Sequence, residues 1–274
     1  MLENRKYFWL MAVALLSAAV ALASPQAVEA YLDEGTGLKR GKLLLGEFRA
    51  PLSAEDEARC LDFLRHKFLA NEVAIGRVRQ NDLADWLLQR PAHTEFAALA
   101  LFEIIEDEEA DLLWREFCVQ KLAIAATQPV LSESTRNRCA QVLVEKAGDP
   151  RMAFSGTALL GLYHLSASEK VAEVIDAEHL IELAEHILEG AQFATANKVT
   201  ALQVAGLSGS RKAVELARSI AFDDSRPMQM RVSAVALLGS RGEASDLPEL
   251  KRLRQSLDSR LRKSANAAIQ NLTS

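Results

Sequence analysis

The chain has 274 residues, of which 49% are hydrophobic and 25% are charged, and its 32 basic and 37 acidic side chains give a net charge of −5. This composition is that of a globular protein, and it excludes a disordered, collagen-like or multi-span membrane chain. The acidic balance argues against nucleic acid as a partner, because non-specific binding to nucleic acid depends on a basic field. Glycine and proline are sparse, with 13 and 7 residues, which favours helices.

Residues 1–30 have the pattern of a signal peptide. Two basic side chains come first, and the stretch 7–28 carries no charge. The triplets that end at Ala23 and Ala30 both fit the small-x-small rule of signal peptidase. We therefore expect an exported protein, periplasmic or secreted in a bacterium. The alternative is an uncleaved N-terminal anchor in the inner membrane with the chain facing outward, since the uncharged run is long enough to span a bilayer.

The stretch 31–52 is predicted to be an extended leader, with a weak strand signal at 43–48. Helices follow, and Ser53, Thr94, Ser132 and Asp176 are residues of the type that cap helix N-termini. The helices are predicted from residue 53, over 73–88, 96–105 and 112–126, around Cys139, around 159–162, and over 176–190, 195–207, 212–222, 228–238, 247–257 and 260–272. Short turns rich in Gly, Pro, Asp and Ser separate them.

A small residue recurs at one place in successive helices. These register positions are Cys118, Ala158, Ala201, Ala234 and Ala265, and the spacings between them are 40, 43, 33 and 31 residues. From Ala158 onward a hydroxyl residue directly precedes each one. A small side chain lets two helices cross closely, and one further helix fits between successive positions. The repeating unit is therefore predicted to be a pair of helices, and the fold an all-α solenoid.

A basic side chain stands three residues before the register position at Arg115, Lys198, Arg231 and Arg262. The segment 231–253, which begins Arg-Val-Ser-Ala-Val-Ala-Leu-Leu-Gly, resembles HEAT repeats of the short bacterial, phycobilisome-lyase type. The resemblance is clearest over 110–274, and we extend the array to 53–274. It implies a right-handed α-solenoid of stacked antiparallel helix pairs, HEAT- or armadillo-like. It also implies a polar ladder between repeats from an Asp four residues before the Arg, which Asp111 and Asp258 match.

One helix carries His179, Glu182 and His186 at positions i, i+3 and i+7, which places them on one side of the helix. They are a weak candidate metal site, because zinc needs at least three donors and usually a fourth from elsewhere. The simpler interpretation is a polar helix face. The sequence has no phosphate-binding glycine loop and no nucleophile or metalloprotease motif, so we predict no catalytic residue and no cofactor.

The three cysteines are Cys60, Cys118 and Cys139, an odd number for an exported chain. All three lie in apolar helical patterns. Two interpretations remain open: a disulfide between Cys118 and Cys139, or buried thiols that behave as small hydrophobic side chains.

Charge is concentrated in two places. An acidic run comprises Glu103, Glu106, Asp107, Glu108, Glu109 and Asp111, and a basic set comprises Lys251, Arg252, Arg254, Arg260, Arg262 and Lys263. Both could be solvated faces, and the basic set could instead bind a partner.

We expect an exported, non-catalytic scaffold that binds a protein or peptide, since stacked helical pairs form a long ridged surface. A membrane would be contacted only through a retained N-terminal segment. The alternative is a lyase-like enzyme or a metal-dependent protein built on the same helical array.

Overall fold

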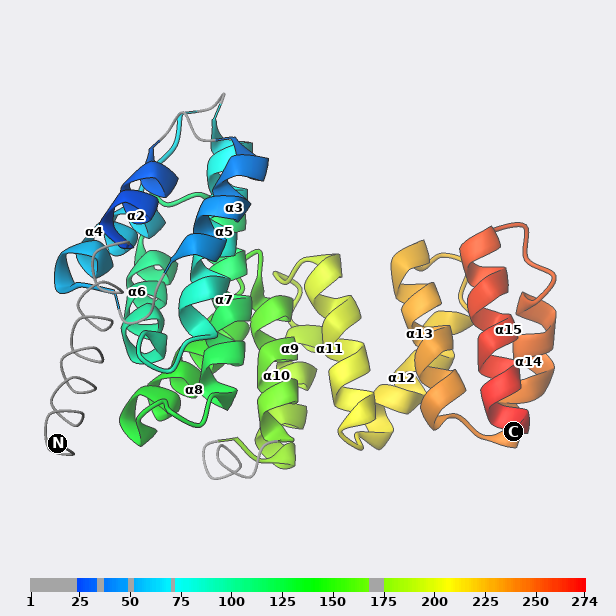
Figure 1. The fold of residues 1–274 in the computed structure, drawn as a ribbon. Helices are drawn as coiled ribbons and strands as arrows, with labels where there is room; N and C mark the ends of the chain where they lie inside the picture. The colour runs from blue at the N-terminus through cyan, green and yellow to red at the C-terminus, as the bar shows by residue number, and fades with distance from the viewer. Residues whose placement is uncertain (1–23, 34–36, 49–51, 70–71, 168–174) are drawn as a thin grey trace, which may run out of the picture. The chain divides into compact units, whose positions relative to one another are not determined.

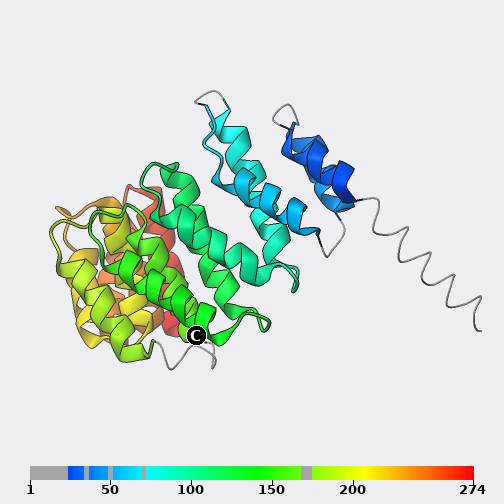
Figure 2. The ribbon, with the colours of Figure 1, turned by 90° about the vertical axis from the view of Figure 1, so that its left-hand side faces the viewer.

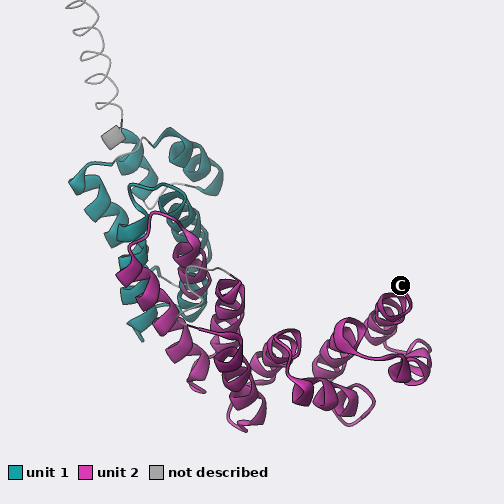
Figure 3. Ribbon diagram, turned by 90° about the horizontal axis from the view of Figure 1, so that it is seen from below, with its two compact units in different colours: residues 1–118 teal, residues 119–274 magenta. Residues whose placement is uncertain are grey.

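The structure is a computed structural model, and it describes residues 24–33, 37–48, 52–69, 72–167 and 175–274. Within these ranges the chain is helical and contains no β-strand (Figure 1). It divides into two compact units, residues 1–118 and 119–274, which Figure 3 shows in different colours. Most of the predicted signal peptide, residues 1–23, lies outside the described residues.

Unit 1 is built from paired helices around an apolar core. Its helices are α2 (Ser24–Leu32), α3 (Leu38–Glu47), α4 (Ala54–Arg65), α5 (Val73–Leu88), α6 (Thr94–Glu106) and the first part of α7 (Leu112–Thr127). Helix α4 packs against α2, α5 and α6. The leucine and isoleucine side chains that form the centre, such as Leu64, Leu83 and Ile105, are completely buried.

The segment 31–52 differs from the extended leader that we predicted. It contains the end of α2 and the whole of α3, which lie side by side (Figure 2). Burial explains the difference, because Val28, Tyr31 and Leu45 enter the core of unit 1. The weak strand signal at 43–48 likewise falls on helix, up to Glu47.

Unit 2 is an array of helical pairs. Its helices after α7 are α8 (Glu133–Gly148), α9 (Ser155–Ser166), α10 (Ala177–Glu189), α11 (Thr195–Leu207), α12 (Arg211–Ala221), α13 (Met228–Arg241), α14 (Leu247–Leu253) and α15 (Ser259–Thr273), with the short 3₁₀ helix η1 (Ala244–Asp246) before α14. Helices α9, α11, α13 and α15 stack in this order, while α10, α12 and α14 each pack against an adjacent member of the stack. This is the HEAT-like α-solenoid architecture that the repeat pattern predicted.

The register positions lie where the stacked helices meet. All five side chains, from Cys118 to Ala265, are completely buried. The hydroxyl residue before the register position joins neighbouring repeats: Ser233 Oγ donates to the Val199 carbonyl at 3.3 Å, and Ser264 Oγ donates to the Val232 carbonyl at 3.2 Å. Both acceptors stand two residues before the register position of the preceding repeat, so the same bond recurs along the stack.

Buried arginines cap the ends of preceding helices. Arg115, Arg136 and Arg231 each donate from Nε to the carbonyl oxygen ten residues earlier, at 3.0, 3.1 and 3.3 Å. These carbonyls belong to the last turns of α6, α7 and α12, where helices leave carbonyl groups unsatisfied.

The two aspartates that the resemblance placed in a polar ladder between repeats form other contacts. Asp111 forms an ion pair with Arg77, and Asp258 accepts N–H groups at the start of α15.

The predicted helix starts are mostly confirmed. The side chains of Ser53, Ser132 and Asp176 each accept a backbone N–H in the first turn. Thr94 is an exception, because its hydroxyl donates to the Arg90 carbonyl at 3.0 Å and the N-cap is His93. The helix predicted over 247–257 ends at Leu253, and the remaining residues form the turn before α15.

Candidate functional site

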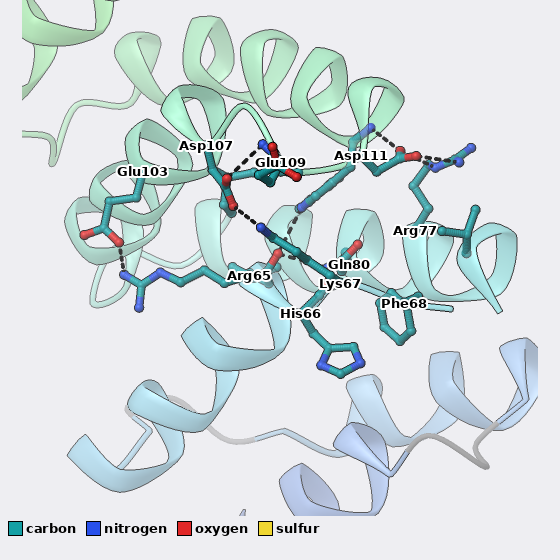
Figure 4. Close-up of a pocket in the computed structure, with 15 residues that line it drawn as sticks. Arg65, His66, Lys67, Phe68, Arg77, Gln80, Glu103, Asp107, Glu109 and Asp111 are labelled. Atoms are coloured by element: carbon teal, nitrogen blue, oxygen red, sulfur yellow. Dashed lines mark hydrogen bonds and ion pairs between the residues drawn. The ribbon is translucent and has the colours of Figure 1, made fainter. Parts of the chain in front are cut away.

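A groove of about 430 Å³ opens within unit 1 (Figure 4). It lies between the end of α4, the first turns of α5, the last turn of α6 and the turn before α7. Pockets of this size hold small ligands or a few side chains of a peptide. The groove is therefore the candidate functional site of this unit.

The floor of the groove is apolar and fixed. Leu64, Ile104 and Trp114 line it and are buried, and the indole Nε1 of Trp114 donates to the Leu64 carbonyl at 2.9 Å. The ring of Phe68 packs directly on Gly76, where any side chain would overlap the ring. Since a larger residue at position 76 would displace Phe68, this glycine sets one wall.

The segment that follows α4 is held by one buried amide. Gln80 on α5 donates from Nε2 to three carbonyl oxygens, those of Phe63 at 3.1 Å, Leu64 at 2.9 Å and His66 at 2.9 Å. These bonds satisfy carbonyls at the C-terminus of α4 that have no helical partner. They keep the backbone from residue 63 to residue 66 in place beside the groove.

Three ion pairs form the rim. Arg65 pairs with Glu103, the Lys67 Nζ lies 3.0 Å from Asp107 Oδ2, and the Arg77 Nε lies 2.8 Å from Asp111 Oδ1 (Figure 4). The basic partners come from α4, α5 and the segment between them, while the acidic partners come from α6 and the turn before α7. The hydrogen bond from Lys67 lowers the pKa of Asp107, so this carboxylate stays charged at neutral pH.

The rim carries one more acidic group than basic groups. Its acidic side chains are Glu103, Asp107, Glu109 and Asp111, and its Arg and Lys side chains are Arg65, Lys67 and Arg77. The carboxylate of Glu109 has no ion-pair partner among the described residues. The groove thus offers an apolar floor, charges of both signs and a slight preference for a neutral or positively charged ligand.

The sequence analysis did not find this groove. It singled out the acidic run 103–111 and interpreted it in the first place as a solvated face, whereas three of these carboxylates pair with basic side chains that are distant in sequence. The sequence does contain the basic partners of these carboxylates, at positions 65, 67 and 77. Spacing alone does not reveal that they face the acidic run.

The candidate metal ligands are on α10, outside the groove. The imidazole of His179 is 71% exposed and its Nδ1 lies 3.1 Å from Asp176 Oδ1, while the ring of His186 contacts Phe193 edge-on. In the described ranges no group of three or more His, Cys, Asp and Glu side chains is placed to hold a metal ion.

The predicted partner-binding residues are also separate from the groove, since they lie in unit 2 on α14, α15 and the turn between them. Three of the six have local partners: Arg252 pairs with Glu249, Arg260 pairs with Asp258, and Arg262 donates to the Ser256 carbonyl. All six are exposed, Arg254 in the turn included.

None of the three cysteines forms a disulfide. Cys60, Cys118 and Cys139 are all completely buried, and the proposed bridge between Cys118 and Cys139 is not formed. They occupy small apolar positions, and the latter two each follow a capping arginine by three residues. Among the described helices, none is long and apolar enough to cross a membrane.

The comparisons with known proteins give a structural likeness that is distant. No family model matches the sequence, and no curated protein matches it. Among solved structures, human deoxyhypusine hydroxylase in complex with glycerol is similar at 13% identity and a TM-score of 0.42, over 95% of this chain and 99% of that chain. A likeness this distant brings no reaction, ligand or residue role to this chain.

The prediction that this chain is not an enzyme is nevertheless corrected. It depended on the idea that a helical array without a recognised motif is a binding surface alone, and the matched structure is that of an enzyme. Because a fold does not by itself determine function, the helical-repeat fold is no reason to exclude catalysis.

Proposed function

We propose that this chain is a helical-repeat binding protein whose unit 1 groove takes a short segment of a protein partner. The observation that carries the proposal is the combination of a buried apolar floor with a rim of ion pairs in one groove of about 430 Å³. An apolar side chain of the partner would displace water from the floor. Its polar backbone and charged neighbours would then meet the rim.

The rim favours a segment that is neutral or basic next to its apolar anchor, because Glu109 is unpaired among the described residues and could receive a Lys or Arg. Such recognition uses a few well-placed contacts rather than a large area. The export of the chain is part of the proposal and rests on the N-terminal sequence pattern.

The proposal is tested by phage display, in which peptides that bind the purified chain are selected from a random library. Peptides enriched on the wild type are expected to carry an apolar residue beside a Lys or Arg. Ala110 lines the groove, so Ala110→Trp should fill the groove. The affinity of these peptides should then fall about tenfold or more, which is the effect of losing one central contact. Ala236→Trp, at an exposed helical position in unit 2, is the matched control.

A second pair of variants tests the rim. Lys67→Asp makes the rim more acidic, so it should strengthen the binding of peptides that carry Lys or Arg. The charge-swapped chain Lys67→Asp with Asp107→Lys keeps the net charge of the rim and re-forms the ion pair, so its binding should return towards that of the wild type. Peptides that bind Ala110→Trp as tightly as they bind the wild type would contradict the proposal. So would a selection without enrichment.

The alternative from the sequence, an enzyme or metal-dependent protein on the same helical array, is tested on the same purified chain. Elemental analysis would show stoichiometric zinc, and His179→Ala would lose it, if α10 contributed to a metal site. Zinc that is absent, or unchanged in this variant, would reject the metal-dependent form at α10.

A further inference from the structure

The turn between α14 and α15 presents a leucine entirely to solvent. Leu257 is 100% exposed, whereas the next most exposed large hydrophobic side chain in the described residues is Leu69 at 70%. The turn is short, with α14 ending at Leu253 and α15 beginning at Ser259. A single exposed apolar side chain is common on protein surfaces, so what Leu257 can bind depends on the side chains around it.

Basic side chains surround this leucine. The segment 251–263, which we call the basic tip, contains six basic residues and one acidic residue, a net charge of +5 in a chain whose net charge is −5. Helices α14 and α15 pack together as an antiparallel pair, so the last turn of one and the first turn of the other lie at the same end. The basic side chains of the tip therefore gather around the turn.

Half of these charges have no partner of their own. The side chains of Lys251, Arg254 and Lys263 form no ion pair with any described residue, and all three are exposed. The acidic residues at the same end of the stack are neutralised, since Asp223 pairs with Arg226 and Asp224 pairs with Arg231. The equivalent Ser233 and Ser264 bonds make α13 and α15 parallel, which places the turn before α13 at this end.

We propose that the basic tip is a docking surface for an anionic lipid bilayer. Leu257 enters the apolar layer, and the Lys and Arg side chains around it contact the lipid phosphates. The pairing of an apolar tip with a basic ring suits the membrane interface, where both kinds of contact are made at once. An acidic protein partner would use the charges without needing a leucine at the tip.

Helix α3 in unit 1 provides an internal comparison. It also has exposed basic residues, Lys39, Arg40 and Lys42, and an exposed Leu43, but this leucine is only 65% exposed. The net charge of α3 is +2, against +5 for the basic tip. Bilayer attraction rises with the number of basic groups at the surface, about fivefold for each Lys or Arg, so the tip is the stronger site.

The test is co-sedimentation of the full chain with vesicles of equal parts phosphatidylcholine and phosphatidylglycerol, compared with vesicles of phosphatidylcholine alone. Binding to the phosphatidylcholine vesicles shows how much the uncharged stretch 7–28, which all variants share, contributes to membrane binding. The triple variant Lys251→Glu, Arg254→Glu, Lys263→Glu should lose about a hundredfold in affinity for the anionic vesicles. Leu257→Ser should lose about tenfold, and Leu257→Trp should retain binding with a blue shift of its fluorescence.

Two variants on α3 are the matched controls: Lys39→Glu, Arg40→Glu, Lys42→Glu for the charge change and Leu43→Ser for the leucine. Both should bind like the wild type, and circular dichroism should show unchanged helicity in all variants. The proposal is overturned if the wild type prefers neither vesicle, or if the α3 variants lose binding while the tip variants keep it. It is also overturned if Leu257→Ser binds like the wild type, which would mark the tip as a general anion-binding surface.

Discussion

At the residue scale, His93 shows how a polar side chain becomes part of the core of unit 1. It is completely buried and stacks on Trp86. Its Nε2 accepts the Leu52 N–H at 3.3 Å, so its Nδ1 carries the proton and donates to Glu57 Oε1 at 2.7 Å. Both ring nitrogens are thereby satisfied, which is what a buried imidazole requires.

We therefore predict that His93→Ala lowers the free energy of unfolding by roughly 3 kcal/mol, because it opens a void beside Trp86 and leaves the Leu52 N–H without its partner. Urea denaturation measures the change. His179→Ala is the control, since the exposed His179 should change stability by less than about 0.5 kcal/mol. Equal effects of the two substitutions would refute the role of His93.

The cysteines give a second prediction at this scale. Burial, and after it the neighbouring Asp56, raises the pKa of Cys60 to about 12, so almost no thiolate forms at pH 8. Cys118 and Cys139 are buried equally deeply. A thiol reagent at pH 8 should find no rapidly reacting group in the native chain and three groups after unfolding. If only one thiol reacts after unfolding without reductant, the other two cysteines are joined in a disulfide.

At the element scale, the stacked helices of unit 2 approach closely at glycine. A side chain at Gly239 on α13 would place its Cβ 2.7 Å from the Cα of Ala268 on α15, a backbone atom that cannot move without the helix. Gly206 on α11 occupies the equivalent position, five residues after the register alanine, and meets Leu237. The spacing of the helices thus depends on these positions as well as on the register alanines.

Gly239→Ala should therefore destabilise the chain by about 2 kcal/mol, since the steric strain exceeds the helix propensity of at most about 1 kcal/mol that alanine adds. Gly46→Ala on α3 is the control, because no atom lies within 4 Å of its added Cβ. That variant should be neutral or more stable than the wild type. Thermal unfolding followed by circular dichroism distinguishes the two, and a stabilised Gly239→Ala variant would show that α13 and α15 separate without cost.

At the scale of the whole molecule, the position of α2 bears on where the chain is processed. The hydroxyl of Tyr31 donates to the Arg79 carbonyl at 2.7 Å, and the Arg79 guanidinium donates to the Tyr31 carbonyl. The same guanidinium lies over the ring of Phe63. Helix α2 is thus joined to α4 and α5, so the cleavage triplet that ends at Ala30 falls inside a helix of unit 1.

A chain that begins at Ser24 should consequently match the full chain in the stability of unit 1. A chain that begins at Tyr31 should be less stable by roughly 2 kcal/mol or more, because it lacks the buried Val28 and most of α2. Urea denaturation of both forms checks this expectation. Intact mass spectrometry of the exported protein should give an N-terminus at Ser24, and a fully stable form beginning at Tyr31 would be inconsistent with this role of α2.

The two proposed surfaces also belong to this scale, because one lies in each unit. Ala110→Trp should leave vesicle binding unchanged, and Leu257→Ser should leave peptide binding unchanged, since sites that share no residues act independently. Measuring both properties in both variants checks the assignment of each surface to its own function.

The sequence by itself determined the helical-repeat fold. Apolar residues at helical spacing and a recurrent small residue define the stacked helices, and both signals are local, so α5 and α11 were predicted with the same bounds as in the structure. The sequence also marked the capping residues Ser53, Ser132 and Asp176, whose hydrogen bonds reach only three residues along the chain.

Only the tertiary structure decided where the functional surfaces lie. The groove depends on Lys67 meeting Asp107 and on Trp114 reaching Leu64, contacts across 40 and 50 residues that no spacing rule contains. The helical state of 38–47 depended likewise on burial against α2 and α5. Local propensity and periodicity decide the elements of a chain, whereas a site arises from side chains that the packing of those elements brings together.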